Sequence, residues 1–79
     1  MSNKPTREEL VEKLKTPGWQ METGSKGFQI HGTLEELLEK THARRASGEA
    51  PGLIRQFETG LELNMIQISE LWEHLGLPI

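Results

Sequence analysis

The sequence predicts an α+β fold: a helix, a β-hairpin, a second helix and a long or bent C-terminal helix. In three stretches the apolar residues recur every three or four positions, which is the spacing of one face of an α-helix. Between residues 19 and 31 they alternate with polar residues instead, as they do in a strand. All 12 acidic residues are glutamate, which favours helices more than aspartate does. An all-α small bundle with residues 19–31 irregular is the alternative.

The length of 79 residues allows one small domain, which we expect to span residues 6–79 after a disordered N-terminus over residues 1–5. A chain of this length buries only about 60–65% of the surface that its unfolded form exposes, so the core is thin. The chain has no cysteine, which excludes disulfides and thiolate metal sites. Packing and self-association remain as sources of stability.

The first helix is predicted to begin at Thr6, because Thr6 and Glu9 have the spacing of a capping box. In this motif each side chain accepts a hydrogen bond from the backbone amide of the other residue. Pro17 ends the helix, since a proline disfavours helical dihedral angles at the residue before it. A helix this short is marginal alone and must pack its apolar stripe against the rest of the chain.

Residues 19–31 predict a β-hairpin with a glycine-containing turn. The apolar residues expected on its inner face are Trp19, Met21, Phe28 and Ile30. An isolated hairpin is barely stable in water, so helices must cover that face. By alternation, Gln20, Gln29 and His31 lie on the opposite face.

The second helix is predicted to begin at Thr33, which forms another capping box with Glu36. Glutamates occupy its first turn and Arg44 and Arg45 its last, which suits the helix dipole. Pro51 fits the first position of the helix that follows the next loop.

The C-terminal stretch, residues 51–77, carries more apolar surface on one side than any other part of the chain. Its stripe consists of Leu53, Ile54, Phe57, Leu61, Met65, Ile68, Leu71, Trp72 and Leu75. Gly60 is a poor mid-helix residue, and Asn64 with Gln67 resembles a further capping box, so a bend is expected near residues 59–63. A strand over residues 61–63 is a further option. Gly76 suits a left-handed cap at the end.

This apolar surface exceeds what two short helices and one hairpin can cover, which predicts a partner surface. We therefore expect a small non-enzymatic protein–protein interaction or adaptor domain that self-associates through its C-terminal helix. The simplest partner is a second copy in a two-fold homodimer. The predicted interface residues are Phe57, Leu61, Met65, Ile68 and Trp72.

Two alternatives belong to other functional classes. A small ligand would occupy a pocket between the hairpin and the helices, although the polar residues of the hairpin face away from it. A nucleic acid or another anion would contact the basic cluster His42, Arg44 and Arg45. Two arginines neutralise too few phosphates to hold a duplex at physiological salt, and the net charge is −3, so nucleic acid is disfavoured.

No residue pattern predicts catalysis, a cofactor or a metal ion. The three histidines, His31, His42 and His74, lack the spacing of metal ligands, and residues 24–27 lack the full spacing of a phosphate-binding loop. No run approaches the roughly 18 apolar residues of a membrane span, and none at the N-terminus resembles a signal peptide. The expected location is therefore the cytoplasm.

Overall fold

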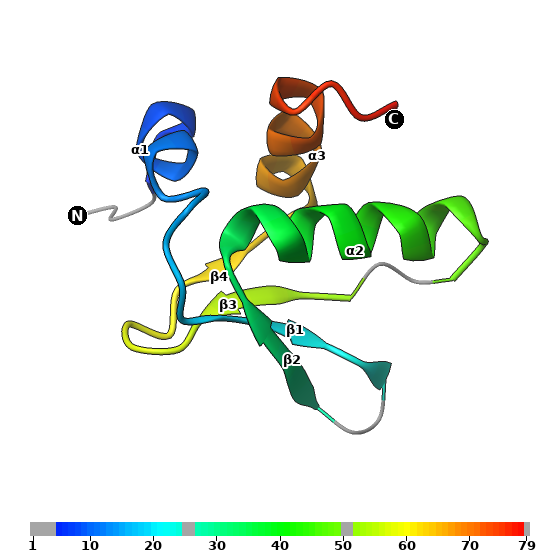
Figure 1. The fold of residues 1–79 in the computed structure, drawn as a ribbon, viewed down its shortest axis with the longest axis horizontal. Helices are drawn as coiled ribbons and strands as arrows, with labels where there is room; N and C mark the ends of the chain where they lie inside the picture. The colour runs from blue at the N-terminus through cyan, green and yellow to red at the C-terminus, as the bar shows by residue number, and fades with distance from the viewer. Residues whose placement is uncertain (1–4, 25–26, 50–51, 79) are drawn as a thin grey trace.

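A computed structural model describes residues 5–24, 27–49 and 52–78, which form an α+β fold of two layers (Figure 1). The predicted class is therefore confirmed, and so is the order helix, hairpin, helix. The described elements are α1 (Arg7–Glu12), β1 (Trp19–Glu22), β2 (Phe28–Gly32), α2 (Leu34–Ala46), β3 (Ile54–Gln56), β4 (Glu62–Leu63) and α3 (Met65–His74). Residues 1–4 of the predicted N-terminal tail, residues 25–26 of the hairpin turn and Pro51 lie outside the described residues.

The four strands form one antiparallel sheet in the order β2-β1-β3-β4. β1 lies inside the sheet because it pairs with β2 on one side and with β3 on the other. Gln20 at its centre stands opposite His31 on β2 and opposite Arg55 on β3. The sheet thus aligns one residue from each of three neighbouring strands in a row.

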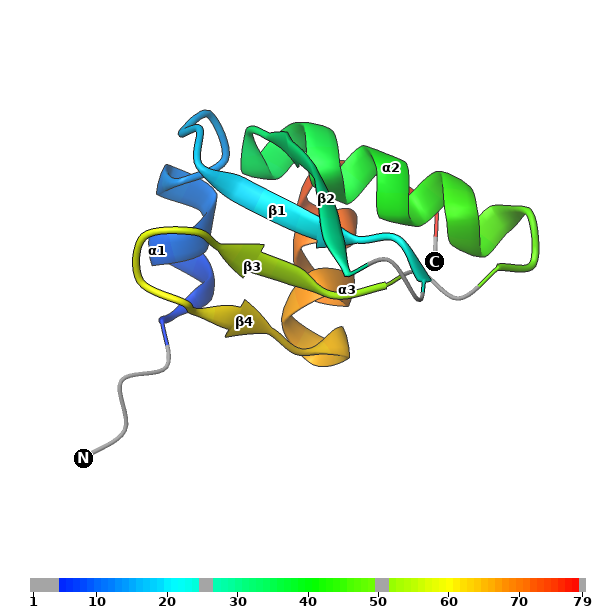
Figure 2. The same cartoon turned by 90° about the horizontal axis from the view of Figure 1, so that it is seen from below.

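The three helices cover one face of the sheet, and the other face has no described helix over it (Figures 1 and 2). We call this second face the open face. Between the sheet and the helices lies the core, whose buried members are Leu10, Leu14, Trp19, Met21, Leu34, Leu37, Leu38, Ile54, Leu63, Ile68, Leu71 and Trp72. The Trp72 indole N–H donates to the carbonyl oxygen of Leu38 at 2.9 Å, which ties α3 to α2.

The N-terminal ends of the helices follow the predicted caps. Thr6 accepts a hydrogen bond from the Glu9 amide, and Thr33 accepts one from the Glu36 amide, each at 3.2 Å. Asn64 and Gln67 form a complete capping box that starts α3. At the C-terminal end, Gly76 adopts a φ of +79°, as the predicted left-handed cap requires. In the part of the chain that the structure describes, no helix is long and apolar enough to cross a bilayer.

The predicted long helix over residues 51–77 is wrong for its first half. Residues 54–63 form the hairpin β3–β4, and only Met65–His74 are helical. Gly60 has a φ of +73°, which turns the chain between the strands instead of continuing a helix. Residues 54–56 form a strand because the free edge of β1 has backbone groups that need hydrogen-bond partners. The pairing extends on both sides of β3: the Glu22 amide donates to the Leu53 carbonyl at 2.9 Å, and the Phe57 amide donates to the Gly18 carbonyl at 2.7 Å.

Phe28 also departs from the prediction, which placed it on the inner face of the hairpin. The pairing of β1 with β2 shifts between Met21 and Glu22, so that Phe28 stands opposite Glu22. Glu22 is two residues from Gln20 and shares its face of the sheet. This bulge therefore turns Phe28 to the open face, where its side chain is half-buried.

Candidate functional site

A row of polar side chains crosses the centre of the open face. Gln20 lies on the side of the sheet that the described helices leave uncovered, yet it is only 6% exposed. Its neighbours on the flanking strands, His31 and Arg55, both approach its side-chain amide. The amide is therefore shielded by side chains of the same face instead of by a second layer of structure.

Arg55 is held in a defined position by two kinds of contact. Its Nε and Nη2 atoms donate to the Gln20 Oε1 atom at 3.3 and 3.0 Å. Its guanidinium carbon lies 3.9 Å from the centre of the Phe28 ring, which is the geometry of a cation–π contact. A forked pair of hydrogen bonds and an aromatic stack together restrict a side chain that is otherwise flexible.

Apolar side chains flank Arg55 along its own strand. Leu53 and Phe57 lie directly outside β3, and their backbone hydrogen bonds with Glu22 and Gly18 continue its pairing with β1. With Arg55 they alternate with the inward-facing Ile54 and Gln56, which places all three on the open face. The exposed fraction is 37% for Leu53 and 66% for Phe57. Two exposed apolar side chains therefore lie beside an ordered arginine on the open face.

The open face also carries acidic side chains. Glu62 stands opposite Arg55 in the pairing of β3 with β4, and Glu22 stands opposite Phe28 in the pairing of β1 with β2. Both charge signs therefore occur on the open face. Its cation is Arg55 on β3, and its carboxylates are those of Glu22 on β1 and Glu62 on β4.

The five predicted interface residues do not form one surface. Ile68 and Trp72 are fully buried in the core of a single copy, so placing them at an interface was wrong. Leu61 is half-buried against the core, and Met65 is exposed in the first turn of α3. Phe57 alone among the five lies on the open face. Among the described residues of the C-terminal stretch, the large apolar side chains that are exposed are Leu53, Phe57, Met65 and Ile66.

The predicted basic cluster is largely engaged in packing around Trp72. The His42 ring meets the Trp72 ring edge-on, with centroids 5.4 Å apart, and its Nε2 atom contacts the Pro78 carbonyl oxygen. Arg45 lies over the same indole at 5.5 Å, and Arg44 is half-buried. These contacts stabilise the C-terminal end of the fold, and Arg45 remains exposed beside them.

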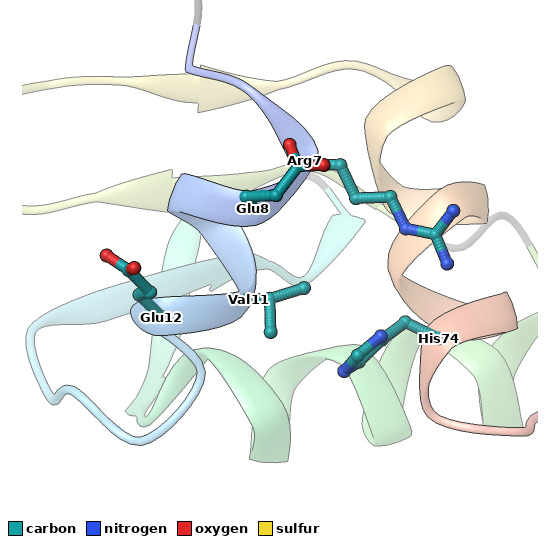
Figure 3. A pocket seen from close by; sticks show the side chains of 5 residues that line it. All are labelled: Arg7, Glu8, Val11, Glu12 and His74. Carbon is teal, nitrogen blue, oxygen red and sulfur yellow. The ribbon is translucent and has the colours of Figure 1, made fainter.

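A cleft of about 400 Å³ lies between α1 and α3, and Figure 3 shows the side chains that line it. Arg7 and Val11 from α1 and His74 from α3 point into the space between the two helices. Only Val11 is half-buried there; Arg7, His74 and the other lining residues, Glu8 and Glu12, are exposed. Ligand sites usually bury most of their ligand against an apolar lining, and this cleft does not offer one.

The space between the first hairpin and the helices, where a ligand pocket was expected, is filled by core side chains. Trp19 and Met21 are both buried there against α2 and its neighbours. Across residues 5–24, 27–49 and 52–78, no three histidine, cysteine or acidic side chains gather in a way that would hold a metal ion. Comparison with protein-family models, with curated proteins and with solved structures finds no match to this chain.

Sequence reasoning placed Gln20 and His31 on the outer face of the hairpin but missed their link to Arg55. The apolar residues of 51–77 fit the spacing of a helix, but residues 53–57 also alternate with the period of two that is typical of a strand. Leu53, Arg55 and Phe57 alternate with Ile54 and Gln56, and a Thr-Gly pair follows at residues 59–60. That pattern, an alternating run closed by a turn, is the signal that would have found β3.

Proposed function

We propose that this chain is a non-enzymatic protein–protein interaction domain that self-associates through the open face. The observation that carries the proposal is the exposure of Phe57 and Leu53 on either side of an arginine that Gln20 holds in place. Phenylalanine and arginine are enriched at interface centres, and a fixed arginine loses little side-chain entropy on binding. The proposal takes the cytoplasm as its setting.

The partner in this proposal is a second copy of the chain. The open face carries Arg55 together with Glu22 and Glu62, so its charges complement those of an identical face turned by a two-fold rotation. Two such sheets would pack face to face at about 10 Å, the usual separation of stacked sheets. This arrangement would also give a thin single-layer sheet the second cover that it lacks.

The proposed surface differs from the C-terminal helix that the sequence suggested. Ile68 and Trp72 of α3 are in the core, while Met65 and Ile66 are exposed in its first turn. α3 belongs to the helical layer on the opposite side of the sheet (Figure 1). Ile66 therefore serves as a control: it is an exposed apolar residue that the proposed interface does not use.

Sedimentation velocity on the full chain, from micromolar to millimolar concentration, tests the proposal. We expect the wild type to show a reversible monomer–dimer equilibrium. Phe57→Glu is expected to raise the dissociation constant about 30-fold, the effect of losing an interface contact of about 2 kcal/mol. Ile66→Glu, at a residue that is 73% exposed, is expected to leave the equilibrium unchanged.

A strictly monomeric chain at about 1 mM would overturn self-association, because a dimer weaker than this has a binding free energy of only about 4 kcal/mol. An equal effect of Phe57→Glu and Ile66→Glu would place the interface elsewhere. Phe28 and Phe57 beside Arg55 also resemble a stacking platform for single-stranded nucleic acid, which the carboxylates of Glu22 and Glu62 oppose. Salt-dependent binding of a labelled single-stranded oligonucleotide, lost in Phe57→Glu, would replace the proposed function with that one.

A further inference from the structure

We infer that His31 and Gln20 are positioning residues for Arg55, and that this arrangement requires a neutral His31, so that acidification releases Arg55. The arrangement within one copy stands on contacts among three residues. Its consequence for self-association rests on the proposed function.

The first step concerns the orientation of the Gln20 amide. An arginine side chain has five N–H donors and no acceptor, so the atom that it contacts must be an oxygen. Two of these donors, on Nε and Nη2, reach the same atom of Gln20, at 3.3 and 3.0 Å. The oxygen of the amide therefore faces Arg55, and its NH2 group faces the other way.

The second step concerns the tautomer of His31. The Gln20 NH2 nitrogen lies 3.3 Å from the His31 Nε2 atom. Because the NH2 group only donates, the Nε2 atom has to accept, and an imidazole nitrogen accepts only when it carries no proton. His31 must therefore be neutral with its proton on Nδ1.

The third step is the conflict that protonation creates. An imidazolium has an N–H on both nitrogens and no acceptor, so its Nε2–H would point at the Gln20 NH2 group. Rotating the amide by 180° offers the oxygen to His31 but turns the NH2 group toward the donors of Arg55. No orientation of Gln20 satisfies a charged His31 and Arg55 together.

The charged groups around His31 among the described residues are Arg55, Glu22 and Glu36. Arg55 lies beyond Gln20 and repels a second positive charge, and Glu22 lies two residues along β1 on the same face. Glu36 approaches Gly32 from the helical side, with its carboxylate 3.5 Å from the position that a Cβ on Gly32 would take. His31 itself is exposed on the edge strand β2, so protons reach it from solvent.

The expected consequence is a pH-dependent open face. Histidine is the side chain whose charge ordinarily changes between pH 5 and 8. Once His31 is charged, either Gln20 or Arg55 loses its hydrogen bonds, and Gln20 is too deeply buried to replace them readily with water. The inference takes the second outcome, in which the amide turns its oxygen to the imidazolium. Arg55 then leaves its place between Leu53 and Phe57, and the surface that the proposed dimer uses loses its order.

Nuclear magnetic resonance on the full chain tests the inference within one copy. At pH 8 the imidazole ¹⁵N signals of His31 should show the form protonated on Nδ1. As the pH falls from 8 to 5.5, exchange of the Arg55 Nε–H with water should accelerate about tenfold beyond its intrinsic pH dependence, which corresponds to losing one charge-assisted hydrogen bond. A His31 protonated on Nε2 at pH 8, or an Arg55 signal unaffected by the fall in pH, would overturn the inference.

Two variants sharpen this experiment. Gln20→Glu replaces the amide by an isosteric carboxylate that only accepts, so both Arg55 and a charged His31 can donate to it. In Gln20→Glu the release of Arg55 between pH 8 and pH 5.5 should disappear, because one carboxylate can accept from both side chains. His31→Gln should keep Arg55 protected at every pH, because its side-chain oxygen can accept from Gln20; a surviving pH response in His31→Gln would also overturn the inference. His74→Gln, on α3, should behave as the wild type does.

The two proposals fail in distinguishable ways. If the chain is monomeric at every pH but the Arg55 signal follows His31, the proposed function falls and the relay within one copy stands. If the chain dimerises while the Arg55 signal ignores His31, the proposed function stands and this inference falls. Sedimentation at pH 8 and pH 5.5 completes the comparison, with a dissociation constant at least tenfold higher at pH 5.5 expected for the wild type and no change for His31→Gln.

Discussion

Arg55 and Gln20 stand opposite each other on neighbouring strands, and the arginine donates two hydrogen bonds to the glutamine oxygen although 35 positions separate them in the chain. An arginine on a surface normally samples many rotamers, and ordering it costs up to about 2 kcal/mol. In this structure the Arg55 side chain is already ordered on folding, because its guanidinium is also stacked on Phe28. A partner that binds the open face would meet an arginine whose position is set in advance.

The first prediction concerns this guanidinium. Arg55→Lys keeps the charge but removes the forked hydrogen bonds and the planar stack, so we expect the free energy of unfolding to fall by about 1–2 kcal/mol. Urea unfolding followed by tryptophan fluorescence measures the change. Lys40→Arg, on the exposed side of α2, is the control and should have no effect. An Arg55→Lys protein as stable as the wild type would show that the contacts to Gln20 and Phe28 contribute nothing.

The second prediction uses two isoleucines that are two positions apart on α3. Ile68 is fully buried and Ile66 is mostly exposed. Ile68→Ala should destabilise the fold by about 2–5 kcal/mol, since it removes buried methyl groups and leaves a cavity. Ile66→Ala should stay within about 0.5 kcal/mol of the wild type. Chemical denaturation of both variants checks the pair, and a larger loss from Ile66→Ala would mean that the helix is rotated from the orientation described here.

The third prediction compares two glycines of positive φ. A Cβ added at Gly52 would lie 2.7 Å from the carbonyl oxygen of Glu22, whereas one at Gly60 would meet nothing within 4 Å. Gly60→Ala should therefore cost only the left-handed backbone conformation, about 1–2 kcal/mol. Gly52→Ala should cost clearly more, because backbone atoms of β1 or of the loop must also move. Thermal unfolding of the two variants ranks them, and equal losses would contradict the close approach at Gly52.

The fourth prediction concerns pH and the ion pair between Lys15 and Glu35, which joins the end of the first helical segment to α2. The hydrogen bond to the Glu35 carboxylate raises the pKa of Lys15 above its ordinary value. A raised pKa means that any stabilisation is fully present below the range where an unfolded lysine titrates and is lost as the pH rises through the raised value. The effect should be small, because Lys15 is highly exposed.

Lys15→Gln provides the measurement for that pair. Its melting temperature should be slightly below that of the wild type at pH 8, and the two should converge above the raised pKa of Lys15. Lys40→Gln, which lies outside this ion pair, should show no such convergence. A gap between Lys15→Gln and the wild type that widens at high pH would have the wrong sign for the ion pair.

Local signals in the sequence were sufficient for much of the fold. The three predicted capping motifs depend on residues within one turn of each other, and Thr6, Thr33 and Asn64 all cap their helices. Asn64 and Gln67 form the complete box, whereas the Glu9 and Glu36 carboxylates accept from the Thr6 and Thr33 hydroxyls. The hairpin from Trp19 to Gly32 was likewise visible in the alternation of its residues. Such features need no distant contact, which is why one sequence is enough to predict them.

Features that depend on distant contacts were missed. Residues 54–56 became a strand because β1 offers a free edge, a fact of tertiary structure that overrides the helical spacing of the same residues. Phe28 was misplaced because a bulge reversed its face. Ile68 and Trp72 were assigned to an interface because the prediction underestimated how much apolar surface α1, α2 and the sheet can bury. The row of Gln20, His31 and Arg55 followed from none of these local patterns, since it combines three strands.

The central position of β1 bears on how the chain acquires its shape as it leaves the ribosome. When α1, β1, β2 and α2 have emerged, β1 still has one bare edge, because its second neighbour is made more than 30 residues later. Nascent chains add about 5–20 residues per second, so β1 remains unpaired on this edge for only a few seconds. Until Ile54–Gln56 arrives and pairs with this edge, the row of Gln20, His31 and Arg55 does not exist, so the surface that we assign to partner binding cannot form before the third strand has been made.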